Sequence, residues 1–169
     1  MFKQKDRMYD YIFPLAVAIR KGLLNYEYSE LIGTGFLIGR NGFALTAAHV
    51  TEQLEVGIKT TEYVMVALFR SESEWHPYEI TGFERHLSED VAIFKISGGP
   101  WQSFFSITDE PEYQGRQFCC YGYPFDIAKE EYLLKADTLD KPDLIYIQGY
   151  PKAHFKRTTG THFERQSIL

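Results

Sequence analysis

Residues 33–50 read GTGFLIGRNGFALTAAHV, and this stretch decides the fold of the chain. The pair Asn41-Gly42 separates two apolar runs, which is a strong signal for a tight β-hairpin. We therefore expect one strand over residues 33–38 and a second over residues 43–46. A short helical turn over residues 47–54 is the only convincing helix signal in the first half of the chain.

Other short segments with strand character recur along the chain at intervals of roughly ten residues, with turn residues between them. Aromatic residues make up 16% of the sequence, and they favour strands. This pattern predicts an all-β barrel or sandwich. The expected strands outside the hairpin cover residues 12–19, 63–69, 78–83, 91–96, 117–121, 132–136 and 144–148.

The tripeptide Gly98-Gly99-Pro100 is the clearest break in the chain. It divides the expected strands into a first set of about six and a second set of about three or four. We expect an N-terminal tail over residues 1–10, a first β-barrel over residues 11–98 and a partial second barrel over residues 99–169.

Composition narrows the class of protein further. A length of 169 residues suits one ordinary domain or two small subdomains that share a core. The net charge of −5, without a long basic run, gives no support for a nucleic-acid partner, and no apolar stretch approaches the roughly 20 residues that span a bilayer. The only cysteines, Cys119 and Cys120, are neighbours, so no disulfide framework is expected and a cytoplasmic location is favoured.

Two segments bring acid–base residues to the ends of expected strands. His49 follows the small residues 47–48, which let the chain turn sharply and leave the imidazole at the edge of a barrel. In residues 89–96, EDVAIFKI, Asp90 opens an apolar strand, so its carboxylate lies at the strand mouth; Glu89 is a weaker rival. A carboxylate beside a histidine fixes the imidazole tautomer and stabilises the imidazolium. The alternatives without a catalytic role are that His49 is a structural histidine and that Asp90 caps the start of its strand.

These segments resemble the trypsin-like (chymotrypsin-fold) serine peptidases, especially the compact bacterial type without disulfides. Residues 33–50 are similar to the histidine signature of that family, and residues 89–96 are similar to its aspartate signature. Residues 115–124, GRQFCCYGYP, resemble the strand that opens the second barrel. The resemblance implies that His49 is a general base and that Asp90 orients it.

The resemblance covers residues 11–165 and implies an all-β, chymotrypsin-like double β-barrel with a complete first barrel and an incomplete second barrel. The family also needs a serine flanked by glycines, because backbone N–H groups must approach the substrate oxyanion closely. No such motif occurs here. Ser167 lies 77 residues after Asp90, but its neighbours Glu164, Arg165 and Gln166 cannot replace those glycines.

We therefore expect a serine endopeptidase chain that is truncated before the nucleophile, supplies only the histidine and aspartate, and is inactive alone. One alternative is a pseudoprotease that serves as a binding or scaffold module. Another is half of a split enzyme that a second chain completes. The expected partners are protein or peptide substrates, with self-association or a complementing chain through the open second barrel as a further option.

The remaining reactive residues have structural interpretations. Cys119 and Cys120 are neighbours in an expected strand, so one should pack in the core and the other should face outward. His86 is expected on the loop that enters the strand at residues 91–96. His154 and His162 should be exposed, and no residues have the close spacing of a metal site, so neither a metal nor a cofactor is expected.

Overall fold

A computed structural model describes residues 8–22, 25–57, 63–71, 74–103, 117–123, 134–135, 138–139 and 144–149. Its named elements are almost all strands, which confirms the predicted all-β class. They are β1 (Ile12–Arg20), β2 (Tyr26–Leu37), β3 (Phe43–Thr46), α2 (Ala48–Gly57), β4 (Tyr63–Ser71), β5 (Glu74–Arg85), β6 (Ala92–Ile96), β7 (Phe118–Gly122), β8 (Leu134–Lys135), β9 (Thr138–Leu139) and β10 (Ile145–Gly149). None of the helices in this described part is long and apolar enough to cross a membrane.

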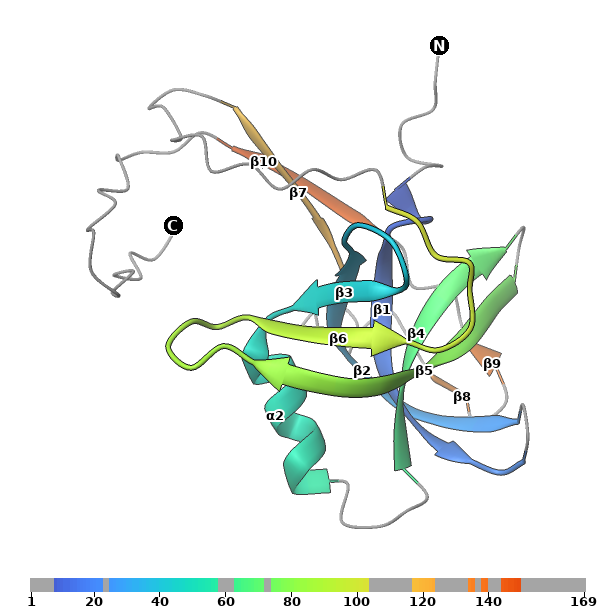
Figure 1. Cartoon of the computed structure of the whole chain (residues 1–169). Helices are drawn as coiled ribbons and strands as arrows, with labels where there is room; N and C mark the ends of the chain where they lie inside the picture. The colour runs from blue at the N-terminus through green and yellow to red at the C-terminus, as the bar shows by residue number, and fades with distance from the viewer. Residues whose placement is uncertain are drawn as a thin grey trace.

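The first six strands close into a barrel with the order β1-β2-β3-β6-β5-β4, and β4 pairs back onto β1 (Figure 1). The predicted hairpin forms its β2–β3 corner, where Phe36 pairs with Leu45. Asn41 has a φ of 70° and Gly42 a φ of 80°. The backbone N–H of Ile38 donates to the carbonyl of Phe43, so residues 39–42 connect the two strands, and Asn41 and Gly42 are in the left-handed region that asparagine and glycine adopt most readily. The hairpin prediction is confirmed.

Two strands are longer than their sequence signals. β2 begins at Tyr26 rather than at residue 33, because its polar first half pairs with β1 as far as Arg20. β5 begins at Glu74 rather than at residue 78, because it pairs with the end of β4. In both cases the backbone pairing of a neighbouring strand extends the element beyond its apolar residues.

The barrel encloses an aromatic core that depends on close approach at a glycine. Phe13 on β1 is fully buried, and its ring lies 4.6 Å from the ring of Phe69 and 6.2 Å from that of Phe94. A Cβ atom at Gly35 would lie 2.4 Å from Phe13 Cε2, so only glycine lets this ring cross β2. A second buried cluster, on the other face of β1, contains Ala16, Ala18, Leu31, Val66 and Leu68.

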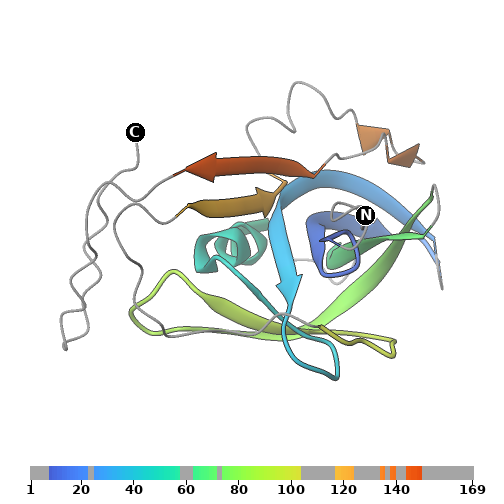
Figure 2. The same ribbon diagram turned by 90° about the horizontal axis from the view of Figure 1, so that it is seen from above.

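The described residues after the barrel form two small antiparallel sheets, β7 with β10 and β8 with β9. The β7–β10 ribbon lies beside the barrel (Figure 2). Thr34 of β2 connects the barrel to the end of β7, because its Oγ1 accepts a hydrogen bond of 2.7 Å from the N–H of Tyr123. Tyr123 is buried with Tyr9 and Leu144. The boundaries at residues 10 and 98, and the extent of a second barrel, stay predictions.

The cysteine prediction is wrong in part. Cys119 and Cys120 are both exposed, whereas one was expected to pack in the core. Neighbouring side chains on β7 still alternate between its two faces, but burial also requires a layer that covers one of those faces. The two-stranded β7–β10 ribbon leaves both faces open at these two positions.

Candidate active site

The hairpin carries His49 directly to the edge of the barrel. Thr46, the last residue of β3, pairs with Ala92 at the start of β6, and its hydroxyl donates a 2.8 Å hydrogen bond to the carbonyl of Thr34. Helix α2 begins two residues later, so His49 lies in its first turn. A Cβ atom at Gly33 would lie 2.8 Å from Val50 Cγ2, so the glycine lets this turn pack closely on β2.

A compact loop between β5 and β6 carries the aspartate. The N–H of His86 donates to the carbonyl of Val91 at 2.8 Å and closes the loop. The Nδ1 atom of His86 accepts hydrogen bonds from the backbone N–H groups of Ser88 and Glu89, at 3.4 and 3.1 Å. His86 therefore lies on the loop that enters β6, as predicted, and it helps to shape that loop.

His49 and Asp90 are in direct contact through two hydrogen bonds. Asp90 Oδ2 lies 2.7 Å from His49 Nδ1, and Asp90 Oδ1 accepts the backbone N–H of His49 at 2.9 Å. An ionised carboxylate can only accept hydrogen bonds, so Nδ1 carries a proton in this contact, and in the neutral imidazole the lone pair is then on Nε2. Both side chains are partly open to solvent, with 57% of His49 and 45% of Asp90 exposed. The pair can accept a proton at Nε2 from a group that approaches from outside.

The rival acid lies elsewhere. Glu89 accepts a hydrogen bond from the hydroxyl of Ser88 at 3.3 Å. Of the two neighbouring acids, Asp90 is the one whose carboxylate contacts the imidazole. The structure brings the two predicted site residues together; their catalytic roles stay a prediction.

The cysteines have a different setting. Cys119 Sγ lies 3.3 Å from the hydroxyl of Tyr146 on β10. This hydrogen bond, with a smaller contribution from burial, raises the pKa of Tyr146 to about 12. A nucleophilic cysteine needs an adjacent base, and a phenol with a raised pKa cannot act as one near neutral pH. The site of interest is therefore the histidine–aspartate pair.

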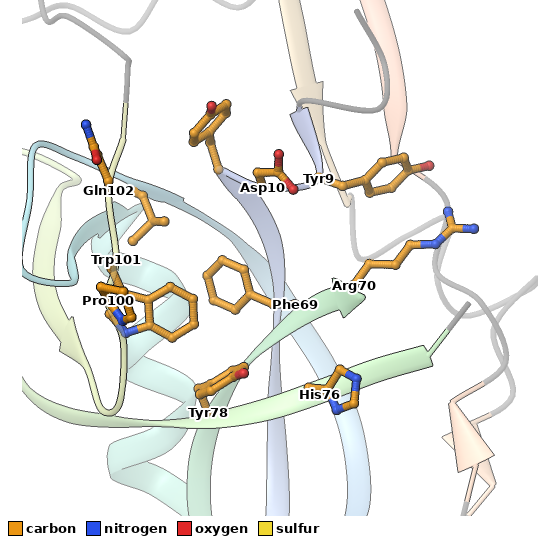
Figure 3. A pocket seen from close by; sticks show the side chains of 11 residues that line it. Tyr9, Asp10, Phe69, Arg70, His76, Tyr78, Pro100, Trp101 and Gln102 are labelled. Atoms are coloured by element: carbon orange, nitrogen blue, oxygen red, sulfur yellow. The ribbon is translucent and has the colours of Figure 1, made fainter. Parts of the chain in front are cut away.

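A half-open pocket of about 390 Å³ lies at the other end of the barrel (Figure 3). Asp90 precedes β6, whereas Trp101 of the pocket follows it, so the strand separates the two sites. The ring of Trp101 lies 4.5 Å from that of Phe69 and 4.7 Å from that of Tyr78. These aromatic rings close this end of the barrel, so the pocket is an outer rim of the core rather than a site served by His49.

Several residues that support the pair were not predicted as site residues from the sequence. Thr34 lies between Gly33 and Gly35, and its two hydrogen bonds, to the hydroxyl of Thr46 and to the N–H of Tyr123, cannot be read from that position in the sequence. Thr51 and Arg85 are 34 residues apart, and their 2.7 Å hydrogen bond depends on the barrel closing. Ser167, which was not favoured as a nucleophile, and His154 and His162, which were expected to be exposed, lie outside the described residues.

Comparisons with known proteins agree with the fold described above. The fold is similar to the MamO protease domain from Magnetospirillum magneticum in its apo form, with a TM-score of 0.50 and 15% identity over 81% of this chain and 58% of that one. It is also similar to the HtrA-type protease AlgW with a decapeptide, with a TM-score of 0.55 and 13% identity over 90% of this chain and 45% of that one. The chain thus spans about half the length of these structures.

A search of curated protein sequences found no match. At such low identity the solved structures show the fold alone, and they confirm the chymotrypsin-like β-barrel class. The sequence model of the trypsin-like peptidase domain matches residues 33–163, a range that includes both His49 and Asp90. Because this match covers most of the chain, the protein belongs to the trypsin-like peptidase domain family.

Proposed function

We propose that this chain supplies the general base and its orienting carboxylate for a trypsin-like serine endopeptidase. The observation that supports this most strongly is the two-point contact of Asp90 with His49, at the ring nitrogen and at the backbone N–H. A carboxylate that holds both groups fixes the position of the imidazole as well as its tautomer. A histidine that only fills space in a core needs no such contact on an exposed edge.

The proposed chemistry follows from that tautomer. Nε2 of His49 takes the proton of a serine hydroxyl as the serine oxygen attacks the peptide carbonyl. The same nitrogen then gives the proton to the leaving amine. Asp90 remains ionised throughout and stabilises the imidazolium. The substrates in this proposal are proteins or peptides, in line with the peptidase family of the chain.

We further propose that the 169 residues have no measurable peptidase activity on their own. The sequence holds no serine with a glycine both shortly before and directly after it, which is the pattern of the family's oxyanion hole; Ser97 precedes Gly98 and Gly99 but follows Ile96. Loss of a triad member lowers kcat by roughly 10⁴- to 10⁶-fold. In the active enzyme the serine would then come from a segment or chain outside these residues.

The tautomer of His49 tests the first proposal without any need for turnover. We expect ¹⁵N NMR spectra to show His49 with its proton on Nδ1. Asp90→Asn should shift that proton to Nε2, because the asparagine NH₂ can donate to Nδ1. Glu89→Gln is the matched control, since it removes a neighbouring charge and leaves the contact in place, so the tautomer should not change. An Asp90→Asn spectrum identical to the parent would refute the proposed roles.

Activity measurements test the second proposal. The purified chain should neither cleave fluorogenic peptides nor react with a fluorophosphonate probe that labels activated serines. Turnover that disappears in His49→Ala would show that a nucleophile lies within these residues. A stable second polypeptide that co-purifies and restores turnover would support completion by another chain.

A further inference from the structure

We propose that Arg85 is a positioning residue that holds the His49 helix against the strand end that carries Asp90. The inference rests on the proposed roles of His49 and Asp90. It assigns to Arg85 no contact with substrate. Its function would be to keep the two halves of the pair in register, through a tie that is separate from the hydrogen bonds of the pair itself.

The tie is a relay of two short hydrogen bonds. Arg85 Nε donates to Thr51 Oγ1 at 2.7 Å, and the hydroxyl of Thr51 donates to the carbonyl of Ala48 at 2.7 Å. Thr51 is fully buried, so water does not compete for its hydroxyl. The relay therefore ends at the residue immediately before His49.

The backbone of Arg85 belongs to the other half of the site. Arg85 is the last residue of β5 and pairs with Ala92, two residues after Asp90. Its neighbour His86 closes the Asp90 loop through the carbonyl of Val91. Arg85 thus has its main chain on the aspartate segment and its side chain on the histidine helix.

Helix α2 depends on tertiary contacts such as the hydrogen bond from Arg85 to Thr51. α2 has ten residues, and no acidic residue in its first turn complements the helix dipole. Isolated helices shorter than about 12–15 residues are marginal in water, so tertiary contacts must hold this one. The contact between His49 and Asp90 is about half exposed and open to competition from solvent, whereas only 25% of the Arg85 side chain is exposed.

The chemistry of the side chain favours arginine at this position. While Nε reaches Thr51, a second guanidinium nitrogen lies 4.0 Å from the Glu52 carboxylate on the same helix. The planar fork of arginine can address both acceptors at once, which a lysine ammonium on a flexible stem cannot reproduce. Glu52 is 65% exposed, so we assign the holding role to the buried hydroxyl of Thr51.

Amide hydrogen exchange provides the test, because the backbone N–H of His49 itself donates to Asp90. The measurement is the exchange rate of this amide in the full chain, relative to that of Ala67 in the core strand β4. Hydrogen bonds to charged groups are strong enough that Arg85→Ala should raise this ratio about tenfold or more. Thr51→Val, which loses the hydroxyl but keeps the shape, should act in the same direction, and Thr51→Ser should restore the parent ratio.

A general loss of stability acts through global unfolding, which raises the Ala67 rate at least as much as the His49 rate, so it cannot raise the ratio. Arg20→Ala is the matched control, since it removes another arginine that joins barrel strands, through Glu79, and it should not raise the ratio. Ratios that do not rise above the parent value in Arg85→Ala and Thr51→Val would overturn the inference. Asp90→Ala separates the two proposals. If this variant does not speed the exchange of the His49 amide, the proposed contact between His49 and Asp90 is wrong. If it does speed that exchange while the Arg85 and Thr51 variants have no effect, only the positioning role of Arg85 is wrong.

Discussion

Replacing Gly35 by alanine should destabilise the barrel much more than a glycine-to-alanine change normally does. A Cβ atom there would lie 2.4 and 2.8 Å from two ring carbons of Phe13, and 3.1 Å from Phe94 Cζ. Carbon atoms in favourable contact are about 3.5–4.0 Å apart, so a shift of about 1 Å is required. Phe13 is fully buried and Phe94 is 2% exposed, and the ring of Phe69 stands 4.6 Å behind that of Phe13. No empty direction is left for the ring of Phe13.

The magnitude follows from two opposing effects. Forcing an extra carbon into a packed core costs about 1–3 kcal/mol, and the short distances at Gly35 place this case at the upper end. Alanine also restricts the unfolded chain, which recovers about 0.4–1 kcal/mol. A net loss of about 2 kcal/mol in the free energy of unfolding remains. For a chain of this length that corresponds to a fall in Tm of about 4–8 °C.

Urea denaturation followed by tryptophan fluorescence measures this loss, because Trp101 packs on Phe69 in the same core. Gly22→Ala is the matched control: its nearest atom outside the adjacent residues is 3.8 Å away, so its stability should change by less than about 0.5 kcal/mol. Phe13→Leu removes the ring atoms that would clash, so Gly35→Ala should cost less in that background. A Gly35→Ala protein as stable as Gly22→Ala, or an undiminished cost beside Phe13→Leu, would refute the reasoning.

Two further predictions concern titration. Burial alone would raise the pKa of Glu79, but hydrogen bonds from Arg20 and Tyr26, together with the Arg20 charge, lower it below its ordinary value. The stability that Glu79 contributes is therefore present above its unfolded-state pKa and is lost as the pH falls through the folded-state pKa. Glu79→Gln should make the urea midpoint fall less steeply below about pH 4.3. An unchanged dependence of the midpoint on pH would contradict this. The Cys119 hydrogen bond is the main cause that raises the pKa of Tyr146, so Cys119→Ala should bring the phenol titration, followed by ¹³C NMR, down from about 12. A titration that stays in place would assign the shift to another cause.

Features that depend on local backbone preference could be predicted from the sequence. The Asn41-Gly42 turn is one, because both residues accept positive φ more readily than most residues do. β3 is another, since its bounds match the apolar run after the turn. The first half of β2 could not be predicted in this way, because its polar residues form a strand only when β1 lies alongside.

In the candidate site, too, features that depend on local sequence could be predicted, and those that depend on closure of the barrel could not. His49 and Asp90 lie in short segments whose patterns are visible in the sequence, and the structure brings their side chains together. Arg85 and Thr51 are joined by a contact that appears only after the barrel has closed. That Cys119 and Cys120 are both exposed was missed, because alternation along a strand tells which face a side chain takes, and not whether that face is covered.

The sequence Gly33-Thr34-Gly35 explains why the hairpin, the core and the site belong together. Gly35 admits a core ring, and Gly33 admits Val50 beneath the turn that carries His49. Thr34 lies between them and bonds in two directions: its carbonyl accepts the hydroxyl at the end of β3, and its own oxygen accepts the N–H of Tyr123, 89 residues away. Three consecutive residues thus contact the barrel interior, the histidine helix and the end of strand β7. A change at any one of them acts on the others through backbone that cannot shift locally, so the catalytic geometry proposed here depends on the packing of β2 as much as on the acid and base themselves.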